Sequence, residues 1–328
     1  MNTRELGSTG LDLTTFSFGA AGIGNLYREV KRETAMETLD AAWDGGFRYF
    51  DTAPHYGHGL SERRLGDFLR GKPKGEYVIS TKVGRLLKPV PESEIPDHGF
   101  VNPLPFAQVH DYGYDAIMRS YEDSLARLGL NEIDMLYIHD LEVPTLGQEA
   151  YERHFAEFLD GGVRALEELK TSGTVKAVGL GVNDVAACMA VLEHFPLDAI
   201  LLAGRYTLLD RSAEPELLDR CRETGTKLVI GGVFNSGILA TGAKPGATFD
   251  YTAASEDILE RVRGMEDEAA KAGVSLAAAA LHFPLSEPLV ASVLIGTANP
   301  NSVRRNLELL DKDVPDDLWP KLSAFAIR

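Results

Sequence analysis

The sequence lacks the features that would direct it to a membrane or to an oxidising compartment. Only two residues are cysteines, Cys188 and Cys221, and neither has a CxxC partner. Both lie in helical patterns, so we interpret them as reduced helix or core residues of a cytoplasmic protein. No run approaches the ~20 apolar residues that a membrane span needs. Residues 1–7 contain no apolar core of a signal peptide.

Positive charge is also scarce. Lysine and arginine number 33 against 49 aspartates and glutamates, which gives a net charge of −16 at pH 7. A chain this acidic, with no basic stripe, is not expected to take nucleic acid or an anionic membrane as its main partner. The 44% hydrophobic and 25% charged residues are typical of a soluble globular protein. No pattern indicates an oligomeric state.

Linkers are missing as well. No Gly/Ser-rich or Pro-rich stretch divides the chain, so we expect one domain over residues 1–328. A doubly wound open sheet is the alternative fold, but no strand leads into a GxGxxG turn. Gly57-His58-Gly59 and Gly179-Leu180-Gly181 are lone glycine pairs and weak evidence for any site.

What the chain has is a regular alternation of strand-like and helical patterns. Eight strand-like runs, many of them continuously apolar, are expected at residues 15–19, 47–51, 77–82, 133–139, 175–182, 199–203, 227–231 and 290–296. Helices are expected at residues 32–45, 61–69, 113–128, 161–170, 184–194, 214–223, 255–272, 276–283 and 301–310. Strands alternating with helices predict βαβ units, and eight of them predict an α/β fold of the (β/α)8 TIM-barrel type.

Two additions to the barrel are expected. Residues 4–13 have two short runs around a glycine-containing turn and could form a hairpin that plugs the bottom of the barrel. Long loops at 84–112, 142–160 and 234–254 would all leave strand C-termini and rim one mouth, as lids or substrate walls or as tolerated surface insertions. Their candidate wall residues are Phe100, Phe106 and His110.

Four polar residues lie at the C-terminal ends of three successive strands. Asp51, Lys82 and His139 each close an apolar run, and Tyr56 follows Asp51 in the next loop. Each alone has an ordinary structural explanation, such as a helix cap, an exposed strand end or a core histidine. Together they indicate an active site on the top face of a parallel barrel, where strand ends converge.

These four groups suit proton transfer. A lysine about 4 Å from a tyrosine, at an effective dielectric near 20, favours the phenolate by roughly 4 kcal/mol. That would bring the pKa of Tyr56 from near 10 to near 7 if Lys82 is close and partly desolvated. Asp51 would keep Lys82 charged and in place, and His139 would hold a substrate oxygen beside Tyr56. Proton transfer coupled to hydride transfer is the reaction that this set suggests.

The same segments resemble the aldo-keto reductase superfamily. The resemblance runs from about Arg4 to Leu310 and rests on the following motifs: Phe50-Asp51-Thr52-Ala53-Pro54-His55-Tyr56-Gly57, Ile79-Ser80-Thr81-Lys82-Val83-Gly84, Ser124-Leu125-Ala126-Arg127-Leu128-Gly129, Ile133-Asp134-Met135-Leu136-Tyr137-Ile138-His139 and Asn306-Leu307-Glu308. It implies a barrel that binds a nicotinamide cofactor across its mouth. It also implies Tyr56 as proton donor or acceptor, Lys82 and Asp51 as the residues that tune it, and His139 as the substrate orienter.

The resemblance also implies cofactor contacts, with departures from the usual pattern. Asn183 is expected to reach the nicotinamide amide, whereas Ala203 stands where a glutamine is usual. Gly231 stands where a stacking tyrosine is usual, and Phe234 is a candidate substitute. The full set of implied cofactor residues is Asn183, Gly231, Phe234, Gly237, Gly296, Thr297, Ser302, Arg305 and Asn306.

The 2′-phosphate positions favour NAD over NADP. Relatives that use NADP carry a lysine and an arginine where this chain has Gly296 and Ser302. Arginine is the natural clamp for phosphate. Arg304 and Arg305 lie nearby and keep NADP as the less favoured alternative.

Within the family, Tyr137-Ile138-His139-Asp140 and Val233-Phe234-Asn235-Ser236-Gly237 resemble the branch of aldose 1-dehydrogenases and pyridoxal 4-dehydrogenase. The resemblance implies oxidation of a cyclic hemiacetal, such as L-fucose, D-arabinose or pyridoxal, to its lactone. One alternative is an NADPH-dependent aldehyde or ketone reductase, and another is a cofactor-sensing subunit with little turnover. A metal-dependent hydrolase using His55, His58 and His139 has no HxH pair in its favour, and we expect no metal site.

Overall fold

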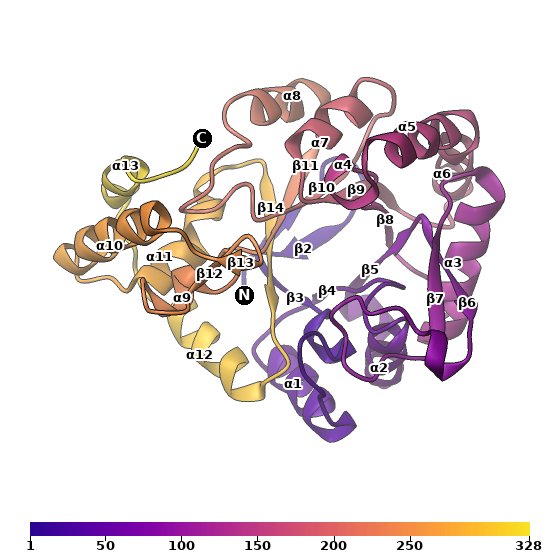
Figure 1. The fold of residues 1–328 in the computed structure, drawn as a ribbon, viewed down its shortest axis with the longest axis horizontal. Coiled ribbons are helices and arrows are strands. Elements are labelled where there is room, and N and C mark those ends of the chain that lie inside the picture. Colours follow the sequence, from indigo (N-terminus) through magenta and orange to yellow (C-terminus); the bar gives the residue numbers. More distant parts are fainter.

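Eight parallel strands close into a barrel in which order along the chain is also order in space (Figure 1). The computed structural model describes residues 1–328. The barrel strands are β3 (Phe16–Gly19), β4 (Tyr49–Asp51), β5 (Val78–Val83), β8 (Met135–His139), β9 (Ala177–Val182), β10 (Ala199–Ala203), β11 (Lys227–Gly231) and β14 (Val290–Gly296). The predicted (β/α)8 fold is therefore confirmed, with each predicted strand found within two residues of its place.

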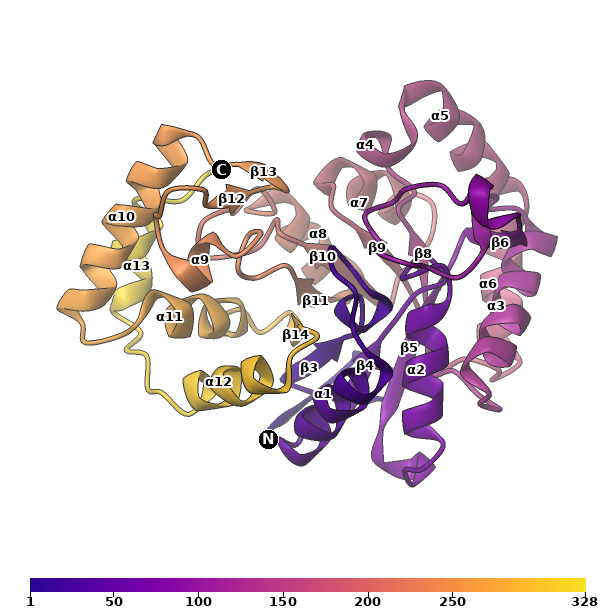
Figure 2. The same cartoon turned by 60° about the horizontal axis from the view of Figure 1, so that its bottom comes forward.

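Helices cover the outside of the barrel (Figure 2). They are α1 (Arg32–Asp44), α2 (Leu60–Leu69), α3 (Tyr114–Leu128), α6 (Val163–Thr171), α7 (Val185–Leu192), α8 (Glu216–Thr224), α10 (Glu256–Lys271), α11 (Leu276–His282) and α12 (Pro300–Leu310). A cluster of 69 buried apolar residues joins these helices to the outward faces of the strands. Most side chains on both faces of the strands are apolar, and the titratable side chains of Asp51, Lys82 and His139 stand at or next to the strand ends.

Strand register places Asp51, Lys82 and His139 in a staggered row, each two residues further along than the partner of the one before. Asp51 pairs with Ser80, Lys82 pairs with Tyr137, and His139 pairs with Gly181. All three strands run in the same direction, so their C-terminal residues meet at one mouth.

The N-terminal hairpin closes the other end. Strands β1 (Thr3–Glu5) and β2 (Asp12–Thr14) pair antiparallel. Leu6, Leu11 and Leu13 are buried in a 12-residue cluster with inward-facing side chains from the first half of the barrel strands. The predicted plug is therefore present, and it packs apolar side chains across the barrel bottom.

The three long mouth loops contain more structure than the sequence indicated. The first holds β6 (Arg85–Pro89), β7 (Phe106–His110) and a short 3₁₀ turn (Glu92–Glu94). The second holds α4 (Val143–Leu146), α5 (Gln148–Glu157) and a π-helical turn (Phe158–Gly162), and the third holds α9 (Ile238–Thr241), β12 (Thr248–Phe249) and β13 (Thr252–Ala253). These elements are short and mostly half-exposed, so they lack the apolar periodicity that marks the barrel elements.

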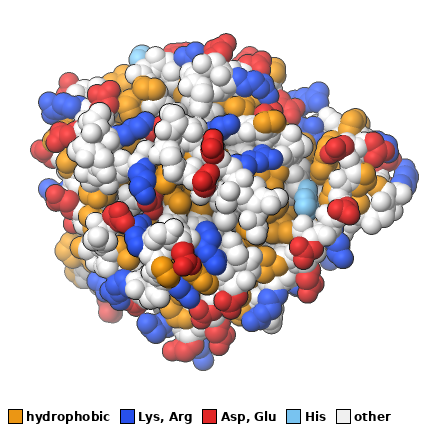
Figure 3. Space-filling view, turned by 180° about the vertical axis from the view of Figure 1, so that it is seen from behind, with side chains coloured by type: hydrophobic (Ala, Val, Ile, Leu, Met, Phe, Trp, Pro, Cys, Tyr) orange, Lys and Arg blue, Asp and Glu red, His pale blue; other side chains and the backbone are white.

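The C-terminal segment adds a helix that was not predicted, α13 (Leu318–Ser323), which packs beside α10 (Figure 1). Arg261 of α10 donates to the carbonyl oxygens of Phe325 and Ala326, at 3.3 Å each. No helix has the length and apolarity to cross a bilayer. On the face shown in Figure 3, acidic and basic side chains are interspersed. Cys188 and Cys221 are buried and unbridged.

Candidate active site

Tyr56 is held over the mouth by a tight loop after β4. Its N–H donates to the carbonyl of Ala53 at 3.1 Å, and its carbonyl accepts from the N–H of Ser61 at 3.1 Å. Gly57 follows with a φ of +63°, in the left-handed region where glycine is favoured. The loop therefore turns directly into α2, and the Tyr56 ring lies half-buried beside the strand ends.

Lys82 and Asp51 form a buried ion pair beside this ring. The Lys82 Nζ donates to Asp51 Oδ2 at 2.7 Å and to the carbonyl of Thr52 at 2.8 Å. The same nitrogen lies 4.8 Å from the centre of the Tyr56 ring. Burial alone would lower the pKa of Lys82, but the carboxylate of Asp51 outweighs it and holds that pKa above its usual value. Lys82 is therefore a fixed cation next to the phenol.

The pKa of Tyr56 itself does not fall to near 7. Burial raises the pKa of the phenol above its usual value, and the opposing effect of the Lys82 ammonium is smaller. The expectation of a neutral pKa is therefore wrong for this structure, because it counted the lysine and left out desolvation of the phenolate. At neutral pH Tyr56 is a phenol, which is the form that donates a proton.

His139 faces Tyr56 across the mouth as a neutral imidazole. The two rings meet edge to face with centroids 6.0 Å apart. Burial, with the cations of Arg85 and Lys82, holds the pKa of His139 well below its usual value. Its Nε2 lies 3.5 Å from Asp140 Oδ2, whereas its Nδ1 is buried without a protein partner. A neutral ring with a free nitrogen is suited to a hydrogen bond with a substrate oxygen.

Arg85 organises a second layer that the sequence analysis missed. Its guanidinium pairs with Asp140, donates to Gln108 Oε1 at 2.9 Å and lies 3.2 Å from His55 Nδ1. Burial and the Arg85 charge lower the pKa of His55 to about 3. Gln108 comes from β7, so the hairpin β6–β7 is part of the site wall. The signal that could have identified this group is Arg85 itself, an arginine three residues after Lys82 on the same side of the mouth.

Of the three predicted wall residues, Phe100 lies against the site. Its ring is 5.1 Å from that of His55 and 6.4 Å from that of Tyr56. His110 lies farther back and stacks on Tyr112, whose hydroxyl donates to the carbonyl of His139 at 2.7 Å. Phe106 begins β7 and is half-buried. An apolar face and a polar face therefore meet at the Tyr56 hydroxyl.

Asn183, the predicted nicotinamide contact, is fixed through its backbone. Its N–H donates to Glu142 Oε2 at 2.8 Å, and its carbonyl accepts from Arg205 Nε at 2.8 Å. Arg205 also binds Asp210 and Asp250, so it ties the end of β9 to the third mouth loop. Ala203 ends β10 and offers no carboxamide. The side chain of Asn183 remains available at the strand end.

A cavity of about 640 Å³ opens beside the ends of β11 and β14. Three of the predicted cofactor residues, Phe234, Gly237 and Gly296, line it. Tyr27 and Tyr251 lie on its rim and are more than half exposed. Six other predicted residues are not among its lining: Asn183, Gly231, Thr297, Ser302, Arg305 and Asn306.

The last four of these lie on the β14–α12 segment, outside the cavity. Arg305 donates to Ser302 Oγ at 3.0 Å, so one exposed cation stands beside Ser302. Arg304 instead donates to Asn301 and shares a hollow with the acidic residues of α1. Thr297 accepts from the N–H of Asn299 at 3.2 Å, and Asn306 is half-buried.

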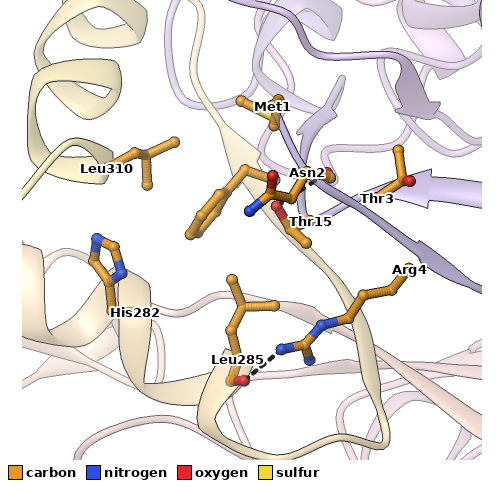
Figure 4. Close-up of a pocket in the computed structure, with 9 residues that line it drawn as sticks. Met1, Asn2, Thr3, Arg4, Thr15, His282, Leu285 and Leu310 are labelled. Carbon is orange, nitrogen blue, oxygen red and sulfur yellow. Dashed lines mark hydrogen bonds between the residues drawn. The ribbon is translucent and has the colours of Figure 1, made fainter. Parts of the chain in front are cut away.

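A larger hollow, of about 780 Å³, lies on the opposite face beside the N-terminus (Figure 4). Its lining includes Arg4 and His282 and none of the predicted site residues. The guanidinium of Arg4 donates to the carbonyls of Leu285 and Val290 at 2.8 and 2.6 Å. That cation holds the N-terminal hairpin against the barrel, so we do not assign this hollow to the chemistry.

Histidines crowd the substrate side of the mouth without forming a metal site. His58 Nε2 lies 3.2 Å from His98 Nδ1, and the His55 ring is 5.8 Å from that of His139. No group of three or more His, Cys, Asp or Glu side chains is placed to hold a metal ion. The alternative built on His55, His58 and His139 thus has no geometric support.

Comparison with known proteins gives the family. Residues 15–327 match the sequence profile of the Aldo/keto reductase family. The chain is 45% identical to pyridoxal 4-dehydrogenase of Microbacterium luteolum, over 97% of this chain and 96% of that protein. It is 39% identical to D-threo-aldose 1-dehydrogenase of a Pseudomonas species, over 96% of this chain and 95% of that protein.

A solved aldo-keto reductase from Bacillus halodurans, in its holo form, superposes with a TM-score of 0.78. It covers all of this chain at 22% identity, with 97% of its own length, and so it supports the fold alone. The family uses nicotinamide cofactors. The match over nearly the whole chain and the two relatives show that this protein is an oxidoreductase of the aldo/keto reductase family.

Proposed function

We propose that the protein is an NAD-dependent dehydrogenase that oxidises a cyclic hemiacetal, pyridoxal or an aldose, to its lactone. The observation that carries this proposal is the meeting of Tyr56, His139 and the Lys82–Asp51 pair at one mouth. The names of the two relatives supply the substrate class: one acts on pyridoxal and the other on aldoses.

The two substrates share the reacting group. Pyridoxal in its internal hemiacetal form and an aldose in its ring form both carry a hydroxyl and a hydrogen on one ring carbon. In the proposed reaction the hydroxyl proton passes to the Tyr56 oxygen, the carbon gives up its hydride, and the C–O bond becomes the lactone carbonyl. NAD, when bound, supplies the hydride acceptor.

The chain's own residues do the rest. Lys82, fixed by Asp51, stabilises the negative charge that Tyr56 must carry to accept a proton. His139, held neutral, donates or accepts one hydrogen bond at the substrate oxygen. Phe100 and His55 form the wall against which the substrate ring would lie. The ion pair of Arg85 and Asp140 places one positive and one negative group beside that wall. A flat, polar ring fits such a wall.

The cavity beside β11 and β14 suits the cofactor. Phe234 and Gly237 leave an aromatic face and open backbone, and Gly296 leaves space at the strand end. Gly296 and Ser302 supply no cation for a 2′-phosphate, which supports NAD. Arg305, beside Ser302, is the one residue here that would favour NADP.

A reductase running in reverse is the second candidate, because one observation favours it. The raised pKa of Tyr56 keeps the phenol protonated at neutral pH, and a phenol is what an aldehyde or ketone needs as it is reduced. The two candidates use the same residues and differ in the direction that turns over.

Initial rates of NADH formation from pyridoxal, L-fucose and D-arabinose test the proposal, with NADP in parallel. Tyr56→Phe should lose at least about a hundredfold in rate while still binding cofactor. Tyr121→Phe, which changes a buried tyrosine on α3, is the matched control. Turnover of aldehydes with NADPH, and of no hemiacetal with either cofactor, would replace the dehydrogenase by the reductase.

A further inference from the structure

A chain of buried hydroxyls runs from the barrel floor to the carboxylate of Asp51. Ser80 Oγ donates to Asp51 Oδ1 at 2.7 Å, Tyr49 Oη lies 2.9 Å from Ser80 Oγ, and Tyr137 Oη lies 3.0 Å from Tyr49 Oη. All four residues are at most 2% exposed. The two tyrosines belong to the cluster that the N-terminal hairpin seals, so the lower end of the chain is closed to solvent.

The direction of these hydrogen bonds follows from counting protons. A hydroxyl has one proton to donate. Ser80 gives its proton to the carboxylate, so the bond between Ser80 and Tyr49 must use the proton of Tyr49. The proton of Tyr49 is then taken, and the bond between the two tyrosines must use the proton of Tyr137. Three O–H groups therefore point, one after another, at Asp51.

We propose that Ser80, Tyr49 and Tyr137 are positioning residues that keep Asp51 a carboxylate and, through Lys82, set the proton affinity of Tyr56. Aligned O–H dipoles polarise one another in a low-dielectric interior. They stabilise the negative charge of a carboxylate that burial alone would protonate. This inference rests on the proposed role of Tyr56.

Two further observations support this reading. Burial raises the pKa of Asp51, and the hydrogen bonds from Lys82 and Ser80 oppose that rise. Burial also raises the pKa of Tyr49 and of Tyr137, so both stay protonated donors wherever the enzyme works.

Gly179, the first glycine of the pair in β9, leaves space beside the hydroxyl chain. A Cβ at Gly179 would come too close to the carbonyl oxygen of Ala199 on β10 and would lie 2.8 Å from the ring of Tyr137. The missing side chain thus makes room for the tyrosine at the bottom of the hydroxyl chain.

The consequence is a shift in pH dependence. Without the Ser80 hydroxyl, Asp51 becomes more basic and shares the proton of Lys82 more evenly. Lys82 then stabilises the Tyr56 phenolate less, and the phenol ionises at higher pH. The charged or titratable groups that act on the Tyr56 or Lys82 side chain, besides these two themselves, are Asp51 on β4, His139 and Asp140 at the end of β8, and Tyr251 on the third mouth loop. Arg85 on β6 and His55, which precedes Tyr56 on the β4–α2 loop, act on His139.

The test compares Ser80→Ala, Tyr49→Phe and Tyr137→Phe over a range from about pH 6 to about pH 11. The rise of the oxidation rate with pH should move upward by about one unit in Ser80→Ala, less in Tyr49→Phe and least in Tyr137→Phe. Ser292→Ala is the matched control. Ser292 is a buried barrel serine that lies 2.6 Å from Ser17 Oγ, donates to Thr14 and has no contact with Asp51.

A second readout needs no substrate. Each protein is titrated by ultraviolet absorbance with Tyr56 present and again with Tyr56→Phe added. The difference between the two titrations is the absorbance change that comes from ionisation of Tyr56. The same ordered shift should appear there, so failure to find a substrate leaves this test intact. The two Tyr→Phe variants keep their rings and carry the test if Ser80→Ala does not fold. A Tyr56 titration in Ser80→Ala and in the two Tyr→Phe variants that is no different from that of Ser292→Ala would reduce the hydroxyl chain to core packing.

Discussion

Glu142 accepts the backbone N–H of Asn183 at 2.8 Å, although burial raises the pKa of this carboxyl group to about 7. Asp140, two residues earlier, adds to the rise, and the hydroxyl of Thr145 opposes it from 2.8 Å. The side chain is 1% exposed. The predicted nicotinamide contact is therefore anchored by an acid that changes charge near neutral pH.

Glu142→Gln should become the more stable protein as pH rises. In the unfolded chain a glutamate titrates near 4.3, so between that value and about pH 7 the folded state holds a proton that the unfolded state has lost. The stability that Glu142 contributes is fully present below the pKa of the unfolded chain. It is lost progressively as the pH rises to the pKa of the folded protein. The difference reaches at most about 4 kcal/mol. The glutamine oxygen accepts from Asn183 and its NH₂ donates to Thr145.

Urea unfolding at about pH 5 and about pH 8 measures this difference. The variant should match the wild type at the lower pH and exceed it at the higher. Glu149→Gln changes an exposed glutamate on the same loop and should show no such divergence. Equal curves for the wild type and Glu142→Gln at both values would mean that Glu142 titrates normally.

Substitutions in the Lys82–Asp51 pair should affect stability and activity differently. Lys82→Met leaves a carboxylate buried and unpaired and should cost about 3–5 kcal/mol of unfolding free energy. Adding Asp51→Asn removes that charge while keeping an acceptor for Ser80, and should restore most of the loss. Activity should stay absent in both, because neither has the cation beside Tyr56. Recovery of turnover in the double variant would show that the charge of Lys82 has no part in proton transfer.

The direction of turnover should depend on pH through Tyr56. Burial raises its pKa above the usual value of a tyrosine, so the phenolate that accepts a proton is a minor form at neutral pH and grows about tenfold per pH unit. Oxidation should therefore speed up with pH in the alkaline range, while reduction stays nearly constant until the pH approaches the pKa of Tyr56. Rates in both directions, measured with one substrate pair, check this. An oxidation rate that is flat above neutral pH would mean that hydride transfer or release limits turnover.

The sequence predicted the parts of the molecule that show an apolar periodicity, and the polar residues that recur at the ends of successive strands. Strand ends such as Asp51, Lys82 and His139 follow apolar runs, and parallel strands bring such ends together. The contacts of Arg85 with Gln108 and His55 come from residues 23 and 30 positions away. They depend on the fold of the β6–β7 hairpin, which has no sequence period of its own.

The pKa of Tyr56 shows a second limit. The residue types indicated which charges would lie near Tyr56. The pKa of Tyr56 also depends on how deeply its hydroxyl is buried, because desolvation opposes the effect of Lys82. The hydroxyl chain is similar: Tyr49 and Tyr137 appear in the sequence as apolar strand residues. Only their register across β4, β5 and β8 puts their hydroxyls in line with Asp51.

Two substitutions should shift the preferred cofactor from NAD towards NADP. Gly296 is exposed at the end of β14, and an added Cβ would have only an ordinary contact, 3.7 Å from the carbonyl oxygen of Gly19. Ser302 lies beside Arg305 on the first turns of α12. Gly296→Lys with Ser302→Arg would therefore place two new cations next to an existing one without disturbing the core.

The double variant should lower KM for NADP by tenfold or more, because each charge-assisted bond to a phosphate contributes roughly 1.4 kcal/mol or more. The kcat with either cofactor should change little, since the hydride-transfer centre is untouched, and KM for NAD is measured in parallel because Gly296 lines the proposed cofactor cavity. Asn301→Arg adds a charge one residue away, where Asn301 is exposed and bonded to Arg304, and serves as the control for net charge. If that control improves NADP use as much as the double variant, the gain comes from general attraction to an acidic protein, and the phosphate lies elsewhere.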